Sequence, residues 1–219
     1  YVFIIKASYL NAYFEAVSGF TTTGITVFSG LDHMPASLIF WRSMTQWIGG
    51  LGILSLFLVI IYQSGSVHHI YSAESHKISS SRPRPGLFNT LKVLWAIYGS
   101  LTALAIAAFT IEGMGFFDAV NHAFTALSTG GFSPHDASIA YYAQNNYKNY
   151  KLIEYTVTFF MLMGGINFLI HFRFFTGDIK ALWDNTEMRL WWKLIGGFLL
   201  LIMINHLQET GWLSRLMAG

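Results

Sequence analysis

The sequence predicts an all-α integral membrane protein in which a unit of helix, short helix and helix is repeated. Of its 219 residues, 53% are apolar and 11% are charged, whereas soluble domains average about 25% charged residues. One pattern of Ala, Thr and Gly also occurs twice, 107 residues apart. The sequence has no cysteine, which excludes disulfides and thiolate metal sites, and its net charge of +2 does not indicate nucleic-acid binding.

Several stretches have the length of a membrane-spanning helix, which needs about 20 apolar residues to cross the hydrocarbon core. Residues 38–62, 87–111 and 152–172 meet that length and are expected to span the membrane. Residues 191–206 form a shorter apolar run, which we expect to be a further span.

Two other apolar stretches, residues 9–20 and 116–127, are too short to span. Turns rich in Gly, Thr and Ser follow both of them. We expect re-entrant half-helices here, since non-helical backbone at membrane depth must be buried in protein or line a water-filled cavity. An amphipathic surface segment or a loop is the alternative that their length leaves open.

The distribution of basic residues predicts the orientation of the chain. Residues 63–92 and 171–193 hold eight of the thirteen Lys and Arg residues, so the positive-inside rule places both in the cytoplasm. Residues 21–40 and 113–147 hold no Lys or Arg, and we expect them on the outer side.

Histidines occur in loops on both sides. On the outer side, we expect His135 and Asp136 to order the loop rather than to bind a metal, because no second His lies at ligand spacing. In the first basic loop, we expect a solvated segment, with a metal site or a pH sensor as the alternative. The histidines concerned there are His68, His69 and His76.

The internal repeat is the most informative pattern. Residues 11–26 align with residues 118–133, with identical or similar residues at seven positions. Each copy is followed by a pair of adjacent glycines, and the two pairs are 115 residues apart. The identical pairs are Ala12/Ala119, Ala16/Ala123, Thr22/Thr129 and Gly24/Gly131, followed by Gly49–Gly50 and Gly164–Gly165.

The Thr and Gly turns of the repeat, residues 21–25 and 128–132, suit a dehydrated cation. A short helix directs the negative end of its dipole and its last carbonyls at the turn that follows. Glycine can adopt positive φ there, so that successive carbonyl oxygens face one place, and neutral oxygen ligands favour an alkali ion.

Four further features of the predicted membrane segments have expected roles. The glycine pairs should let helices approach closely, with a hinge as the alternative. We expect the Arg42 side chain to extend to the outer membrane interface, where Trp41 and Trp47 would form an aromatic belt. The alternative is that Arg42 repels or steers cations near the pore mouth. Glu15 should either support the turn after its helix through hydrogen bonds or raise the cation concentration at the pore mouth. His122 should be a packing residue that forms hydrogen bonds.

The segments FEAVSGFTTTGITV, WRSMTQWIGGLGI and FTALSTGGFSPHDAS together resemble the Trk/Ktr/HKT superfamily of cation transporters, most closely the TrkH-type potassium uptake proteins of bacteria. The resemblance implies four helix, pore-helix, helix repeats around a central pore, of which this chain would hold two. It also implies the bacterial cytoplasmic (inner) membrane, a homodimer, and a separate TrkA-type nucleotide-binding ring as cytoplasmic partner. It implies no cofactor other than the potassium ion itself.

The resemblance also assigns residues to the selectivity filter. Glycine at both matched filter positions, Gly24 and Gly131, favours potassium, with a sodium-permeable transporter as the alternative. Secondary filter candidates are Thr21, Ile25, Ser128 and Phe132, and Glu15 and His122 would support the filters. The primary filter residues implied are Thr22, Thr23 and Gly24 in the first turn and Thr129, Gly130 and Gly131 in the second.

The expected organisation is a first repeat over residues 1–62, a cytoplasmic loop over 63–86, a second repeat over 87–175, and a loop with the start of a third repeat over 176–219. Because the chain opens at Tyr1, we expect a fragment of a longer protein.

We expect potassium uptake and no enzymatic activity. A non-conducting structural subunit is an alternative. An intramembrane enzyme is disfavoured, because its one candidate set would be Ser128 or Ser133 with His122 or His135, and no hydrolase motif accompanies it.

Overall fold

The computed structural model describes residues 1–63, 87–184 and 186–209 of the chain. All of the regular elements in these ranges are helices. The chain divides into two compact units, residues 1–172 and 173–219, and each is described by itself.

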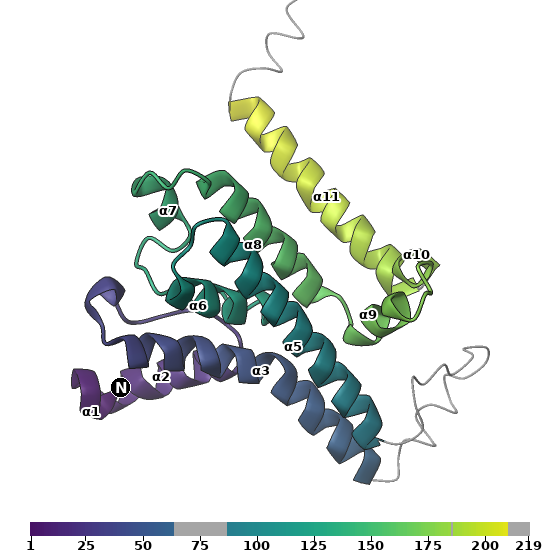
Figure 1. The fold of residues 1–219 in the computed structure, drawn as a ribbon, viewed down its shortest axis with the longest axis horizontal. Helices are drawn as coiled ribbons and strands as arrows, with labels where there is room; N and C mark the ends of the chain where they lie inside the picture. Colours follow the sequence, from purple (N-terminus) through teal and green to yellow (C-terminus); the bar gives the residue numbers. More distant parts are fainter. Residues whose placement is uncertain (64–86, 185, 210–219) are drawn as a thin grey trace, which may run out of the picture. The chain divides into compact units, whose positions relative to one another are not determined.

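The first unit holds both copies of the predicted repeat (Figure 1). Its helices are α1 (Val2–Ile5), α2 (Tyr9–Phe20), the short 3-10 helix η1 (Leu31–His33), α3 (Ala36–Gln63), α5 (Leu87–Ile111), α6 (Phe116–Leu127), α7 (Ala140–Gln144) and α8 (Tyr150–Gly165). Helix α9 (Phe168–Phe175) crosses the boundary, and the second unit holds α10 (Ala181–Asp184) and α11 (Thr186–Glu209).

The two short helices, α2 and α6, begin and end at the residues that the sequence predicts. Ser8 is the N-cap of α2, and its hydroxyl accepts a hydrogen bond from the backbone N–H of Asn11 (3.2 Å). Helix α6 has Asp118 in its first turn, where a carboxylate complements the helix dipole.

The short helices have different surroundings. Helix α6 lies at the centre of the unit and packs against α3, α5 and α8, whereas α2 packs against α3 (Figure 1). Two fully buried alanines one turn apart, Ala119 and Ala123, belong to the core around α6. Small side chains at this spacing let a neighbouring helix approach closely.

One expected span is broken. Helix α8 ends at Gly165, Ile166 is extended (φ −85°, ψ 138°), and α9 begins at Phe168, so residues 152–172 are not one continuous helix. The glycine pair weakens the end of α8, because glycine is a poor helix former. Asn167 then stands directly before α9, where its residue type favours the start of a new helix.

The other long helices cover their expected stretches with small shifts, α3 from Ala36 to Gln63 and α11 from Thr186 to Glu209. Among the described helices, one segment, Leu91–Ile111 of α5, is long and apolar enough to cross a membrane by length and composition. The first basic loop, with His68, His69 and His76, lies outside the described residues apart from its ends, as do residues 210–219.

Candidate ion-binding site

Both short helices end in the same hydrogen-bonded turn. In the first, the N–H of Thr22 donates to the carbonyl of Gly19 (3.0 Å) and the N–H of Thr23 to that of Ser18 (3.0 Å). In the second, the N–H of Thr129 donates to Ala126 (3.0 Å) and that of Gly130 to Thr125 (2.9 Å). These pairs of bonds form a Schellman motif, and the two copies match residue for residue at the offset of 107.

The backbone after each helix also follows the same pattern of dihedral angles. Thr22 (φ 54°) and Thr129 (φ 53°) are left-handed, although glycine is the usual residue at this place in a Schellman motif. Gly24 (φ 77°) and Gly131 (φ 88°) are left-handed two residues later. A left-handed threonine costs about 1–2 kcal/mol, and such strain concentrates at functional sites.

The turns contain carbonyl oxygens without hydrogen bonds. Within the described part of the chain, nothing donates to the carbonyls of the six residues expected to form the primary filter, namely Thr22, Thr23, Gly24, Thr129, Gly130 and Gly131. Two secondary candidates differ, because the Ile25 carbonyl accepts from the Ser18 hydroxyl (2.6 Å) and the Ser128 carbonyl from the Thr129 hydroxyl (2.7 Å). The primary residues therefore have oxygens available for a ligand, whereas Ile25 and Ser128 are engaged with the protein.

The two turns touch each other. A Cβ atom added to Gly24 would overlap the carbonyl oxygen of Gly130. Gly130 in turn lies against the side chain of Gln46 from α3, whose Oε1 accepts a hydrogen bond from the N–H of Phe132 (3.0 Å). Gln46 thus connects helix α3, which follows the first turn, to the backbone of the second turn.

The glycine pairs make the close approach expected of them. A Cβ atom at Gly49 would overlap the carbonyl of Phe20, the last residue of α2. One at Gly164 would overlap the carbonyl of Leu127, the last residue of α6. Each long helix therefore packs directly on the end of the short helix that precedes it, through the equivalent glycine.

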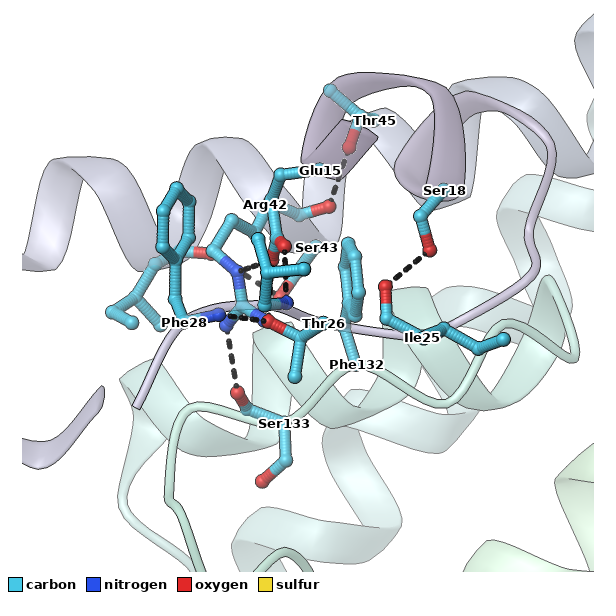
Figure 2. A network of polar contacts seen from close by, with 12 residues as sticks. Glu15, Ser18, Ile25, Thr26, Phe28, Arg42, Ser43, Thr45, Phe132 and Ser133 are labelled. Atoms are coloured by element: carbon cyan, nitrogen blue, oxygen red, sulfur yellow. Dashed lines mark hydrogen bonds and ion pairs between the residues drawn. The ribbon is translucent and has the colours of Figure 1, made fainter. Parts of the chain in front are cut away.

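A buried network lies behind the first turn (Figure 2). Arg42 is 1% exposed, and its Nε donates to Oε1 of the fully buried Glu15 (2.8 Å). The other carboxylate oxygen of Glu15 accepts from the N–H of Val27 (3.1 Å), while Oε1 also accepts from the Thr26 hydroxyl (2.8 Å). Glu15 therefore holds the segment directly after the first turn, at Thr26 and Val27.

The expectation that Arg42 extends to the membrane interface is wrong. A buried carboxylate one helix away holds the guanidinium inside the protein, where pairing offsets the cost of burying either charge alone. Trp47 packs against other helices of the unit. Its ring stacks on Tyr98 and Phe124 (centroids 5.4 and 5.1 Å) and its indole N–H donates to Thr102, whereas Trp41 is 42% exposed.

A second polar cluster, the outer clasp, joins the loops that follow the two turns. The Asp136 carboxylate accepts from the N–H groups of Gly30 and Leu31 (3.0 Å each). The ring of His135 lies between two carboxylates, with Nδ1 2.5 Å from Asp32 and Nε2 3.0 Å from Asp118. His135 and Asp136 therefore hold together the loops that follow the two turns, and hydrogen bonding to His135 holds the pKa of Asp32 below its usual value.

His122 is buried and its ring packs edge-on against Tyr142 (5.7 Å), but its Nε2 has no hydrogen-bond partner among the described residues. The serines proposed for an enzyme are engaged with backbone: the hydroxyl of Ser128 donates to the Thr125 carbonyl, and that of Ser133 accepts from the His135 N–H. In the described ranges, neither hydroxyl is hydrogen-bonded to an imidazole.

Two contributing residues, Ser18 and Gln46, were not assigned a role from the sequence, and the pairing of Arg42 with Glu15 was not predicted. Ser18 and Gln46 gave no signal, because hydroxyl and amide side chains are common in helices. The sequence does contain a signal for the pairing of Arg42 with Glu15, because the two residues carry opposite charges at predicted membrane depth and buried charges need partners.

The chain was compared with known proteins. Residues 5–210 match the family model TrkH, described as a cation transport protein. The chain is 37% identical over 197 residues to the Trk system potassium uptake protein TrkH of Salmonella typhimurium, and 38% identical over 183 residues to that of Escherichia coli K12. The crystal structure of the potassium transporter TrkH from Vibrio parahaemolyticus superposes with a TM-score of 0.72 at 35% identity.

These matches cover most of this chain and less than half of each relative. The aligned regions are 89% of this chain and 39% of the Salmonella protein, 82% and 37% for the Escherichia coli protein, and 94% and 40% for the Vibrio structure. The chain therefore spans about two fifths of the length of the relatives it matches.

Proposed function

Because the chain belongs to the TrkH family of cation transport proteins, we propose that it supplies part of a potassium-selective uptake pathway across the membrane. The observation that carries this proposal is the pair of matching turns. Both end a short helix in a Schellman motif with left-handed threonine, both have left-handed glycine two residues later, and they touch.

The chemistry of the turns favours an alkali cation. Carbonyls of Thr22, Thr23 and Gly24 and their counterparts 107 residues later accept no hydrogen bond from the described chain, so their lone pairs can replace water around an ion. The helix dipoles of α2 and α6 place negative ends at the same two turns. Neutral dipoles bind an ion weakly enough for it to leave again, which a transport pathway requires.

The proposal extends to the organisation of the pore. Residues 1–62 and 87–175 would be two of four repeats, with α2 and α6 as pore helices and residues 21–25 and 128–132 as filters. Residues 176–219 would begin a third repeat, and the remaining filters would come from sequence beyond this chain. The tight packing of Gly49 on Phe20 and of Gly164 on Leu127 supports one architecture for both repeats.

Family membership supports a membrane protein, and we propose the bacterial inner membrane as its location. The relatives are named as parts of a Trk system. This naming supports a regulatory partner, which we propose to be a TrkA-type ring that docks on the basic cytoplasmic loops. A homodimer is part of the same proposal.

The test is the ratio of rubidium to sodium uptake by the complete gene product that contains these residues, reconstituted in liposomes. Gly131 has positive φ and open space around it, so serine fits there at the cost of backbone strain alone. Gly24→Ser is a poorer test, since its Cβ would overlap Gly130. We expect Gly131→Ser to lower the ratio about tenfold, equivalent to about 1.4 kcal/mol of discrimination.

Gly113→Ser is the matched control. Gly113 also has positive φ and open surroundings, but it lies between α5 and α6, away from both turns. We expect the same strain and an unchanged ratio. Wild-type protein without a preference for rubidium would overturn the potassium assignment, and an unchanged ratio in Gly131→Ser would overturn the assignment of the second turn.

A further inference from the structure

The side chain of Arg42 reaches the segments directly after both turns from one position on α3 (Figure 2). Its Nη2 donates to the hydroxyl of Thr26 (3.1 Å), two residues after Gly24. Its Nη1 donates to the backbone carbonyl of Ser133 (3.2 Å), two residues after Gly131. Thr26 and Ser133 are equivalent positions of the repeat, so one guanidinium bonds the residue directly after each turn and joins the two segments.

The geometry of this tie is fixed on every side. Glu15 accepts from Nε of Arg42 at 2.8 Å, and the Phe132 ring lies 4.3 Å from the guanidinium carbon. The Thr45 hydroxyl donates to the backbone carbonyl of Arg42 (2.6 Å), which holds α3 at the same place. A planar guanidinium has five donors in a fixed arrangement, so it can donate hydrogen bonds to three acceptors that lie in different directions. A lysine ammonium on its flexible stem cannot reproduce that arrangement.

The second repeat has no counterpart to this tie. The position equivalent to Glu15 is His122, and the position equivalent to Arg42, at the offset of the glycine pairs, is Val157. The ion pair therefore belongs to the first repeat alone, although its donors reach into both. A residue that served only to stabilise its own repeat would not need to bond Ser133.

We propose that Arg42 is a specificity-determining positioning residue, which sets the separation of the two filter turns and thereby the fit for potassium over sodium. This inference rests on the proposed function of the turns. Glu15 neutralises the guanidinium, so that a cation near the turns meets no net positive charge from this pair. Arg42 itself donates to the segments behind the turns and is not a ligand of the ion.

The test compares Arg42→Lys with Arg173→Lys in the complete gene product. Both changes keep the positive charge and remove a guanidinium paired with a carboxylate. The Arg173–Asp178 pair is exposed on the other compact unit, so it is the matched control. We expect Arg42→Lys to lower the rubidium-to-sodium uptake ratio about tenfold with rubidium uptake still measurable, and Arg173→Lys to leave the ratio unchanged.

A purely structural role would reduce the amount of folded protein and the total uptake without moving the ratio, because the molecules that fold would still have native turns. Should Arg42→Lys fail to accumulate, Thr26→Val is the second variant, since Thr26 is exposed and the loss of its hydroxyl removes its hydrogen bonds to both members of the Arg42–Glu15 pair. We expect a fall of about threefold in the ratio for that variant.

The outcomes separate the two proposals. A selective wild type whose ratio is unchanged in Arg42→Lys, or in Thr26→Val where the first variant does not fold, overturns the role of Arg42 and leaves the function standing. A wild type that does not prefer rubidium over sodium overturns both.

Discussion

The two short helices end in the same turn but are embedded differently. Seven of the twelve residues of α6 are buried, whereas α2 has four of twelve, and its Tyr9, Leu10 and Tyr13 are more than 60% exposed. The Schellman motif and the sequence of left-handed residues are nevertheless the same in both. The backbone of the turn is therefore set by local sequence, and tertiary packing decides only how the turn is held.

The contacts that fix the two turns in place differ accordingly. The first turn is braced by a buried ion pair, Glu15 with Arg42, which bonds Thr26 and Val27. Helix α6, which leads into the second turn, packs against three helices, Gln46 fixes the backbone at Phe132, and Arg42 also donates to the Ser133 carbonyl. The less buried helix, α2, thus carries a buried carboxylate that bonds the segment after its own turn, whereas the more buried α6 packs against more helices.

The largest expected effect is at Glu15. Glu15→Gln removes the negative charge and leaves the buried guanidinium of Arg42 uncompensated, which costs about 3–5 kcal/mol. The equivalent change in the second repeat, His122→Gln, breaks no ion pair and should cost about 1 kcal/mol, as core polar substitutions commonly do. Both are measured as the shift in thermal unfolding of the protein in detergent.

Equal losses for the two variants would contradict this account. They would mean that the ion pair contributes no more to the first turn than ordinary packing does to the second. Lys6→Gln is a suitable control, since Lys6 forms no ion pair with the described residues and its loss should leave unfolding unchanged.

The next largest effect is a difference in stability between alanine variants of the two equivalent glycines, Gly24 and Gly131. Gly24→Ala introduces a Cβ that overlaps the Gly130 carbonyl, in addition to the strain of a left-handed alanine, and should cost about 2–4 kcal/mol. Gly131→Ala has the strain without the overlap and should cost about 1–2 kcal/mol. Unfolding in detergent again gives both values, and an equal cost would show that the two turns are not in backbone contact.

The features that depend on short stretches of sequence could be predicted. Residues 9–20, 87–111 and 116–127 are helical with the expected bounds, because the length of each apolar run and the turn residues after it are local signals. The glycine pairs also make the expected close contacts, since small residues in a long apolar helix have few other uses. The role of the turns in binding an ion stays a prediction.

Features that depend on distant residues could not be predicted. Arg42 was assigned to the interface because a charge in a span usually extends to water, and its partner Glu15 lies 27 residues away on another helix. The break after Gly165 was missed because hydropathy does not register where a helix ends inside an apolar run. The contacts of His135 with Asp32 and of Asp136 with Gly30 join residues more than a hundred positions apart, so they follow only from how the two repeats pack.

The smallest expected effect concerns the outer clasp, which joins the two repeats at the surface. The pKa of Asp32 is lowered chiefly by its hydrogen bond with His135. A carboxyl group with a lowered folded-state pKa stabilises the fold above its unfolded pKa of about 3.9, and that contribution is lost as the pH falls through the lower folded value. We therefore expect Asp32→Asn to lower the unfolding temperature slightly at pH 6, and by progressively less as the pH falls below about 3.9.

The measurement is the difference in unfolding temperature between wild type and Asp32→Asn across that range, with Asp178→Asn on the other unit as control. A difference that narrows as the pH falls supports a carboxylate in the clasp, because the protonated wild type then resembles the amide. A difference that stays constant as the pH falls through the acid range would show that Asp32 acts through hydrogen bonds which the neutral side chain retains. The two repeats would then be joined by the Asp136 bonds to Gly30 and Leu31, and the charge of Asp32 would be incidental.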